Sequence, residues 1–386
     1  MILRWKIGGP VLLLLAAAVL WLFAVGSAKV PSGGAPSLSA KSAVLVDGDD
    51  GTVVYAKNEH EKLAIASTTK IMTSLLTLEE AKKNDRAVTI TPEMIRVEGS
   101  SMYLHAGDRL TLSGLAAGML LVSGNDAANS AAIAVGGSLD AFAAKMNAKA
   151  AALGMKDTHF VTPSGLDDAQ HYSTAYDMAL LAGAALRNPD FAKLACEKTA
   201  KVTFLNPPQT RTLKNHNKLL TLYAGCDGIK TGFTDKAGRC LVSSAQKNGV
   251  HLVAVTLNDP DDWKDHAALF DYGFSRLERH RIDDSAYRVT VPIVGGVKGE
   301  VQVRGTAGDS IVTDSRQPMT RSVELPRFVY APVREGQVLG IVRYVRAGRT
   351  VAQTELLSAE NVAQPPARKN WLQRLWEWMQ DLFSFR

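Results

Sequence analysis

Ser67 and Lys70, in the segment Ser67-Thr68-Thr69-Lys70, are the first pair of residues in this chain whose types and spacing could do chemistry. They lie three residues apart at the start of a predicted helix and therefore share one face. A serine hydroxyl is a weak nucleophile, and a lysine whose pKa is lowered by burial and by another cation can take its proton. Such a pair also arises by chance on solvated helices, so by itself it is weak evidence for a nucleophile and its base.

Two further polar groups follow. Ser123-Gly124-Asn125 comes directly after an apolar segment, so its hydroxyl could relay a proton and its amide could hold an acyl substrate, although in isolation it is better explained as a loop that caps a helix. Lys230 and Thr231 lie in a predicted strand and offer a cation and a hydroxyl to a substrate carboxylate. Gly232 weakens that strand, which we explain by a ligand that must approach its backbone closely.

The elements around these groups predict an α+β fold. Two apolar runs, 42–46 and 52–56, flank an Asp- and Gly-rich turn and predict a hairpin. Helices are expected between this hairpin and three later strands, and one more helix closes the domain. The expected helices are 67–82, 115–122, 127–135, 139–153, 174–186 and 263–277, and the later strands are 228–233, 239–246 and 250–257. We assign residues 42–277 to this domain, and the β-branched runs broken by Gly and Pro at 281–363 to a separate all-β domain.

Both ends of the chain suggest export. Arg4 and Lys6 precede an uncharged run that leads to small residues, so we expect residues 1–28 to be a signal peptide, with an uncleaved anchor as the alternative. Residues 29–41 read as a flexible linker. Residues 367–386 form an amphipathic helix with an aromatic side, for which we favour anchoring on a membrane surface over docking on the protein's own core.

Composition limits the classes of function. Of 386 residues, 46% are hydrophobic and 21% charged, which excludes disorder for most of the chain. The net charge of +6 is not clustered, so it suits an anionic wall or membrane and predicts no nucleic-acid partner. Cys196, Cys226 and Cys240 have no metal spacing and imply no disulfide framework, and we expect small buried thiols. If Phe233 faces Arg239 in a hairpin, Cys226 faces Gln246, too far from Cys240 for a disulfide.

The three polar groups occur in an order known from penicillin-binding proteins and class A β-lactamases. The chain resembles the low-molecular-mass penicillin-binding proteins, which are serine-type D-alanyl-D-alanine carboxypeptidases of peptidase family S11. The likeness extends over about residues 42–277, and the β domain and tail resemble the family's C-terminal half. It rests on the segments 66–73, 123–128, 165–168 with 171–178, and 227–234.

This resemblance implies a β-lactamase/transpeptidase-like catalytic domain and a role for each site residue. Ser67 would attack the penultimate D-alanine carbonyl of a peptidoglycan stem peptide, and Lys70 would accept its proton. Ser123 and Asn125 would complete the proton path and hold the substrate. Lys230 and Thr231 would bind the terminal carboxylate, and Gly232 and Phe233 would also belong to the substrate-binding residues. The backbone amides of Ser67 and Phe233 would form the oxyanion hole. No cofactor or metal is implied, β-lactam antibiotics would acylate Ser67, and the protein would lie on the outer face of the bacterial cytoplasmic membrane. A downstream arginine for the carboxylate, present in some members, is left unassigned, since residues 259–265 are rich in Asp.

Two other functions stay open at this stage. A serine β-lactamase would share the fold but needs a base that activates water against the acyl-enzyme, a Glu in class A enzymes. No Glu occurs between Glu98 and Glu197. An inactive wall-binding scaffold tethered to the membrane is the second alternative, and the presence of both Ser67 and Lys70 counts against it. His171 and His216 have no metal spacing and are interpreted as structural.

Overall fold

The computed structural model describes residues 34–346, 348–367 and 371–383, and these form two compact units. The first unit comprises the described residues up to 247 together with 251–275, and the second comprises 248–250 and the residues from 276 onward. Each unit has its own cluster of buried apolar side chains. The expected signal peptide and the first part of the linker lie outside the described residues. Within the described part, none of the helices combines the length and apolarity that crossing a bilayer requires.

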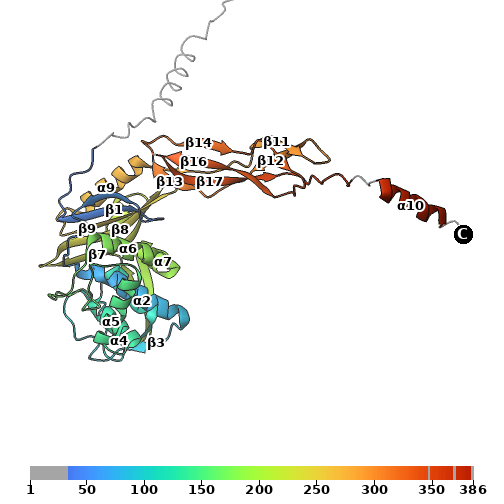
Figure 1. The fold of residues 1–386 in the computed structure, drawn as a ribbon. Helices are drawn as coiled ribbons and strands as arrows, with labels where there is room; N and C mark the ends of the chain where they lie inside the picture. Colours follow the sequence, from blue (N-terminus) through green and yellow to red (C-terminus); the bar gives the residue numbers. More distant parts are fainter. Residues whose placement is uncertain (1–33, 347, 368–370, 384–386) are drawn as a thin grey trace, which may run out of the picture. The chain divides into compact units, whose positions relative to one another are not determined.

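A five-stranded sheet forms the frame of the first unit (Figure 1). Its strands stand in the order β2-β1-β9-β8-β7. β1 pairs antiparallel with both β2 and β9, and β7 pairs antiparallel with β8. The strands are β1 Ser42–Asp47, β2 Val53–Lys57, β7 Cys226–Thr234, β8 Gly238–Lys247 and β9 Val250–Leu257. All residues of β1 are buried, which explains its almost continuous apolar sequence.

The helices of the first unit come mainly between β2 and β7 in the chain, as the sequence predicts, so the α+β assignment is confirmed. Thr111, Ser138 and Thr174 each cap a helix by accepting a hydrogen bond from a backbone N–H of its first turn. The helices are α2 Lys70–Lys83, α3 Leu112–Val122, α4 Asn125–Gly136, α5 Leu139–Ala152, α6 Ala175–Leu186, α7 Pro189–Cys196, α8 Leu219–Leu222 and α9 Asp262–Arg276. Two small hairpins that the sequence analysis missed accompany them: β3 Ala87–Thr89 with β4 Arg109–Thr111, and β5 Thr199–Leu205 with β6 Pro208–Lys214.

The second unit is built of β-strands. Six of them form one sheet in the order β14-β16-β17-β12-β11-β15, and buried Val291, Val303 and Leu356 belong to its core. β10 pairs with β13, so strand structure begins at Leu277, before the expected start at residue 281. The strands are β10 Leu277–His280, β11 Arg288–Val294, β12 Glu300–Gly305, β13 Ile311–Asp314, β14 Thr320–Glu324, β15 Val329–Tyr330, β16 Val338–Arg346 and β17 Arg349–Ser358.

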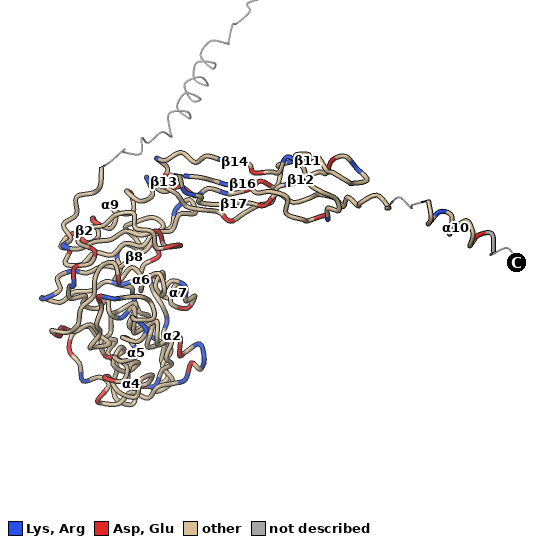
Figure 2. Tube along the Cα trace, in the orientation of Figure 1, with Lys and Arg blue, Asp and Glu red and all other residues tan. Residues whose placement is uncertain are grey.

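The last described element is helix α10, Trp371–Phe383. Three tryptophans and two leucines on it are exposed: Trp371, Leu372, Leu375, Trp376 and Trp378. Figure 2 shows basic and acidic residues interspersed along the described chain, with no dense basic block.

The cysteines correct one part of the sequence analysis. All three described cysteines are free, as predicted, but Cys196 is exposed and Cys226 is partly exposed, so only Cys240 is the buried thiol we expected. Phe233 does face Arg239. Cys226 faces Ala245 instead of Gln246, because an irregularity between Cys226 and Gly228 shifts the register by one residue.

Candidate functional site

Ser67 lies in a short 3-10 turn, Ala66–Thr69, that runs directly into helix α2. The turn begins in an unusual conformation, because Ala66 has a φ of 46°, which side-chain-bearing residues rarely adopt. Thr68 and Thr69 each donate a side-chain hydrogen bond back to the carbonyl three residues earlier, at Ile65 and Ala66. These bonds fix the turn and leave Ser67 as its partly exposed residue.

Lys70 is fully buried beside Ser67. Its Nζ lies 2.9 Å from Ser67 Oγ and donates a 2.6 Å hydrogen bond to the carbonyl oxygen of Ser164. Burial and, second, the charge of Lys230 hold the pKa of Lys70 well below its usual range, against a smaller opposing effect of Asp126. A lysine of lowered pKa within hydrogen-bond distance of a serine hydroxyl is the arrangement that serine activation requires.

Ser123 and Asn125 stand where α3 ends and α4 begins. Ser123 is the C-cap of α3, with φ 60° and ψ 27°, a left-handed conformation that usually favours glycine. Asn125 donates from Nδ2 to the carbonyl of Glu98 at 2.6 Å, and its Oδ1 is buried with no donor among the described residues. Within the same part of the chain, no hydrogen bond joins Ser123 to Ser67 or Lys70.

β7 runs past the Ser67 turn. A Cβ placed on Gly232 would come within 3.0–3.1 Å of the Thr68 and Ser67 nitrogens, a tight contact that a glycine avoids. The backbone of Gly232 is thus approached closely by the turn that carries Ser67. From the sequence we expected that a bound ligand would make this close approach. Lys230 is buried, and burial lowers its pKa to about 7. Phe233, in contrast, is 62% exposed.

The segment of His216 connects the second and third polar groups. Its backbone N–H donates to the Leu121 carbonyl, two residues before Ser123, and its ring is close enough for the charge of Lys230 to lower its pKa, after the larger effect of burial. The structure therefore brings Ser67 with Lys70, Lys230 and the Ser123 loop into one region, although these groups are far apart in sequence.

Asp126 and Ser164 support the site, and the sequence analysis gave neither a role. Asp126 accepts hydrogen bonds from the backbone N–H groups of Met102 and Leu104 and from Ser101 Oγ, so it ties the loop 100–104 to the start of α4. Ser164 offers only a backbone carbonyl, which no side-chain pattern can reveal. Asp126 follows Asn125 directly, and a carboxylate in the first turn of a helix was the available signal.

The Asp-rich segment has a structural role. Asp259 and Asp265 both accept hydrogen bonds from Ser39 Oγ, where the chain enters the first unit. Asp262 receives two 2.8 Å hydrogen bonds from Arg239. No group of three or more His, Cys, Asp or Glu side chains in the described ranges could hold a metal ion.

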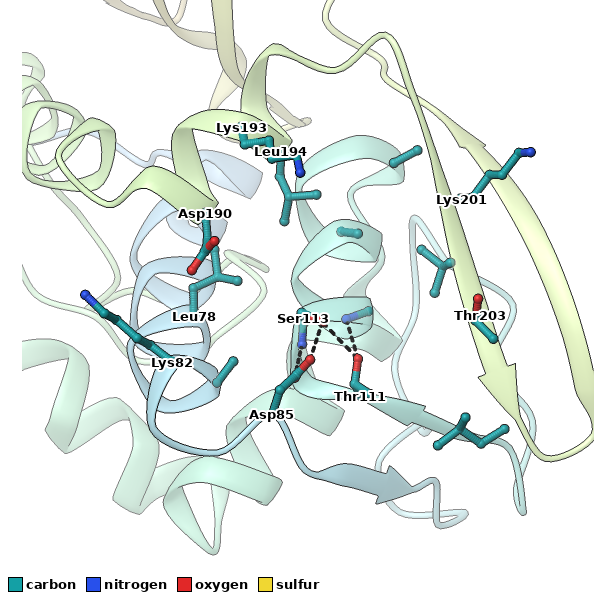
Figure 3. Close-up of a pocket in the computed structure, with 16 residues that line it drawn as sticks. Leu78, Lys82, Asp85, Thr111, Ser113, Asp190, Lys193, Leu194, Lys201 and Thr203 are labelled. Atoms are coloured by element: carbon teal, nitrogen blue, oxygen red, sulfur yellow. Dashed lines mark hydrogen bonds between the residues drawn. The ribbon is translucent and has the colours of Figure 1, made fainter.

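A separate hollow of about 560 Å³ lies between α2, α3, α7 and β5 (Figure 3). Polar groups at one end of it bond one another: Asp85 accepts from the backbone N–H and the hydroxyl of Ser113, and Thr111 caps α3. Lysines and acids alternate on its rim, and none of the predicted site residues lines it. The candidate site at Ser67 is therefore separate from this hollow.

Comparison with known proteins gives the family. Residues 29–261 match the peptidase S11 family model, described as D-alanyl-D-alanine carboxypeptidase. The chain belongs to this family. It is 33% identical over 335 residues to the D-alanyl-D-alanine carboxypeptidase DacF of Bacillus subtilis, covering 84% of this chain and 86% of that protein. It is 34% identical over 371 residues to DacC of Escherichia coli, with 90% of each chain covered.

Solved structures agree with the family assignment. Penicillin-binding protein 5 from Haemophilus influenzae is similar with a TM-score of 0.63 at 29% identity, over 86% of this chain and all of that one (100%). The carboxypeptidase DacD from Francisella tularensis gives a TM-score of 0.64 at 27% identity, over 88% and 98%. The predicted fold and the predicted family are thereby confirmed, and the chain is a serine hydrolase.

Proposed function

We propose that this protein is a serine D-Ala-D-Ala carboxypeptidase that removes the terminal D-alanine from peptidoglycan stem peptides through an acyl-enzyme on Ser67. The observation that carries the proposal is the 2.9 Å contact between Ser67 Oγ and a fully buried Lys70 whose pKa is held low. The family assignment agrees with this chemistry.

Acylation would begin with proton transfer from Ser67 Oγ to the neutral Lys70 amine. The alkoxide attacks the carbonyl of the penultimate D-alanine, and the peptide C–N bond then breaks. The leaving D-alanine nitrogen needs one proton, which the Lys70 ammonium supplies through the Ser123 hydroxyl. Water later hydrolyses the ester and restores Ser67. Asn125 Oδ1, a buried acceptor that no donor among the described residues satisfies, is positioned in this proposal to accept a substrate N–H.

Substrate binding falls to β7. Lys230 and Thr231 would bind the terminal carboxylate, and Gly232 lets this strand lie directly against the Ser67 turn. The backbone amides of Ser67 and Phe233 would form the oxyanion hole, in which one donor is typically worth about 2.7 to 4 kcal/mol of transition-state stabilisation. The exposed Phe233 ring leaves the end of β7 open to a peptide.

The two alternatives are not favoured. A class A β-lactamase places a Glu near the acyl-enzyme, and the described loop that touches Lys70 and the end of β7 instead contributes the Ser164 carbonyl and Asp167, which accepts from Thr234. An inactive scaffold would not need to keep the Ser67 and Lys70 pair in contact. A β-lactam adduct on Ser67 should therefore form and be long-lived.

Intact-mass measurement after exposure to a labelled penicillin tests the site, with Ser67→Ala as the matched variant. We expect one adduct on the wild-type protein, none on Ser67→Ala, and D-alanine release from a soluble D-Ala-D-Ala peptide by the wild type alone. Rapid turnover of penicillin would favour the β-lactamase alternative, and an adduct on Ser67→Ala would refute the role of Ser67.

We further propose that the protein is exported and lies on the outer face of the cytoplasmic membrane, with residues 367–386 anchored in the lipid surface. The exposed tryptophans of α10 support this, because indole rings favour the headgroup region. Deleting residues 367–386 from signal-processed protein should release it from membranes and leave activity on a soluble peptide unchanged. High salt should remove little full-length protein, since apolar burial dominates. Continued membrane binding of the truncated, cleaved form would refute the anchor.

A further inference from the structure

His171 is a buried imidazole that the mechanism above does not use. It is 4% exposed and lies edge-on to Phe160, at a ring-centroid distance of 5.7 Å. It belongs to the loop between α5 and α6, the same loop that supplies the Ser164 carbonyl to Lys70.

The hydrogen bonds of His171 define its tautomer. Its Nδ1 accepts from the backbone N–H groups of Val161 at 3.0 Å and Thr162 at 3.2 Å, so Nδ1 carries no proton. Nε2 must then carry the proton, and it donates to Thr69 Oγ1 at 2.8 Å. The Thr69 hydroxyl in turn donates a hydrogen bond to the Ala66 carbonyl at 2.8 Å. The two bonds at Nδ1 require the neutral ring, because a protonated ring would carry a hydrogen on that nitrogen.

These bonds connect the turn that carries Ser67 with the loop segment that bonds Lys70. On one side, Thr69 belongs to the 3-10 turn that presents Ser67. On the other, Val161 and Thr162 begin a strap, residues 161–165, that accepts two hydrogen bonds from α2. Thr73 Oγ1 donates to the Pro163 carbonyl and Lys70 Nζ donates to the Ser164 carbonyl, both at 2.6 Å.

The strap also packs against the Ser67 turn. A Cβ on Gly165 would lie 1.9 Å from the Ala66 carbonyl oxygen, so these two backbone segments are in direct contact. His171, like Lys70 itself, thus bonds both the turn of the nucleophile and the strap of its base.

We propose that His171 is a positioning residue for acyl transfer: it fixes the distance between Ser67 Oγ and Lys70 Nζ by bonding the turn that carries one and the strap that holds the other. The proposal rests on the roles given above to Ser67 and Lys70. Its chemistry is that of a neutral ring that bridges a hydroxyl and two amides, and the ring touches no substrate.

The groups around the ring favour the neutral form on balance. Burial is the largest effect and lowers the pKa of His171 to about 4. Asp168 and Asp167 oppose this by raising the pKa, and His159 adds to the lowering.

The experiment measures acylation of the full-length protein by a labelled penicillin and turnover of a D-Ala-D-Ala peptide. The fraction of active protein is titrated by adduct stoichiometry, so rates refer to folded sites only. His171→Ala should slow acylation and lower kcat about ten- to a hundred-fold per active site, because small displacements of reacting groups have effects of this size. KM should change less than about two-fold, since the groups proposed to bind the substrate carboxylate lie on β7 and not on the loop of His171.

Two conservative variants separate the bond from Nε2 to Thr69 from the bonds that Nδ1 accepts. His171→Gln keeps a donor near Nε2 and His171→Asn keeps an acceptor near Nδ1, so each should recover part of the lost rate. Thr69→Val removes the hydroxyl while keeping the shape, and should slow acylation in the wild type but add little to His171→Ala. His105→Ala, on an exposed ring, is the control and should leave the rate unchanged.

A loss of active fraction with an unchanged rate per site would overturn the proposal and leave His171 a folding residue. An equal loss in kcat and in substrate affinity would overturn it too. These outcomes differ from failure of the proposed function itself, in which penicillin would not acylate Ser67 in the wild type.

Discussion

The charge on Lys230 should control the pH dependence of substrate capture. Burial lowers the pKa of Lys230 to about 7, so the free enzyme loses this ammonium as the pH rises through 7. Half of the sites are charged at pH 7 and about 1% at pH 9. The Lys230 contribution to kcat/KM for a peptide carboxylate should therefore fall about 50-fold over these two pH units, which corresponds to about 2.3 kcal/mol.

Lys230→Arg isolates this effect, because a guanidinium stays charged at every pH tested. It also keeps a positive charge beside Lys70 at every pH, whereas the wild type loses that charge above pH 7, so the comparison includes the resulting rise in the pKa of Lys70. We expect the ratio of kcat/KM between wild type and variant to be constant below pH 6 and to fall about 50-fold from pH 7 to pH 9. D-alanine release from a soluble D-Ala-D-Ala peptide at constant ionic strength gives the rates.

Lys201→Arg is the matched control, since Lys201 is exposed on β5, away from the site. Its pH profile should coincide with that of the wild type. A ratio between wild type and Lys230→Arg that stays flat from pH 6 to pH 9 would refute the reasoning. So would an alkaline loss that appears in kcat alone, because kcat/KM reports the free enzyme.

Three further predictions follow from the same contacts. Lys70→Arg should fold but lose about 10²- to 10⁴-fold in acylation rate, because a guanidinium cannot accept the Ser67 proton; an unchanged rate would contradict a base role for Lys70. Gly165→Ala should lower the free energy of unfolding by about 2 to 5 kcal/mol, through its φ of 83° and its contact with the Ala66 carbonyl. Gly154→Ala, at a glycine with φ 78° and nothing within 4 Å of an added Cβ, is the control. In urea titrations of both variants it should lower the free energy of unfolding by the smaller amount that the backbone conformation alone costs. In the unfolded chain His171 binds a proton as the pH falls below 6.5, whereas the folded ring binds one only near pH 4. The free energy of unfolding should therefore fall by about 3 kcal/mol through this residue between pH 6.5 and pH 4, and the urea midpoint of His171→Gln should lack this part of the loss.

Much of the fold and the candidate site could be predicted from local sequence. The helices α3 to α6 were placed within a few residues, because apolar periodicity and capping residues such as Ser138 and Thr174 are local signals. The three polar groups were found by residue type and order. The hairpin β5–β6 was missed, since its alternating residues are few and mostly polar.

The register of β7 shows a limit of such signals. The predicted pairing of Phe233 with Arg239 is correct. The predicted partner of Cys226 is wrong by one residue, because the strand is irregular between Cys226 and Gly228, where the chain enters the sheet. The residue after a bulge changes partner without any change in composition or periodicity.

The sequence by itself determined which side chains are available to the proposed site: a serine, two lysines, a second serine and an asparagine, in an order typical of one family. Only the tertiary structure decided their chemistry. A lysine's pKa falls because the folded chain removes its water and places a second lysine nearby, as Lys70 and Lys230 show. Likewise, the strap that holds Lys70 uses a backbone carbonyl, and Gly232 lies in close contact with a turn far away in sequence. Desolvation and backbone contacts of this kind are properties of the packed chain, so no local pattern of residues encodes them.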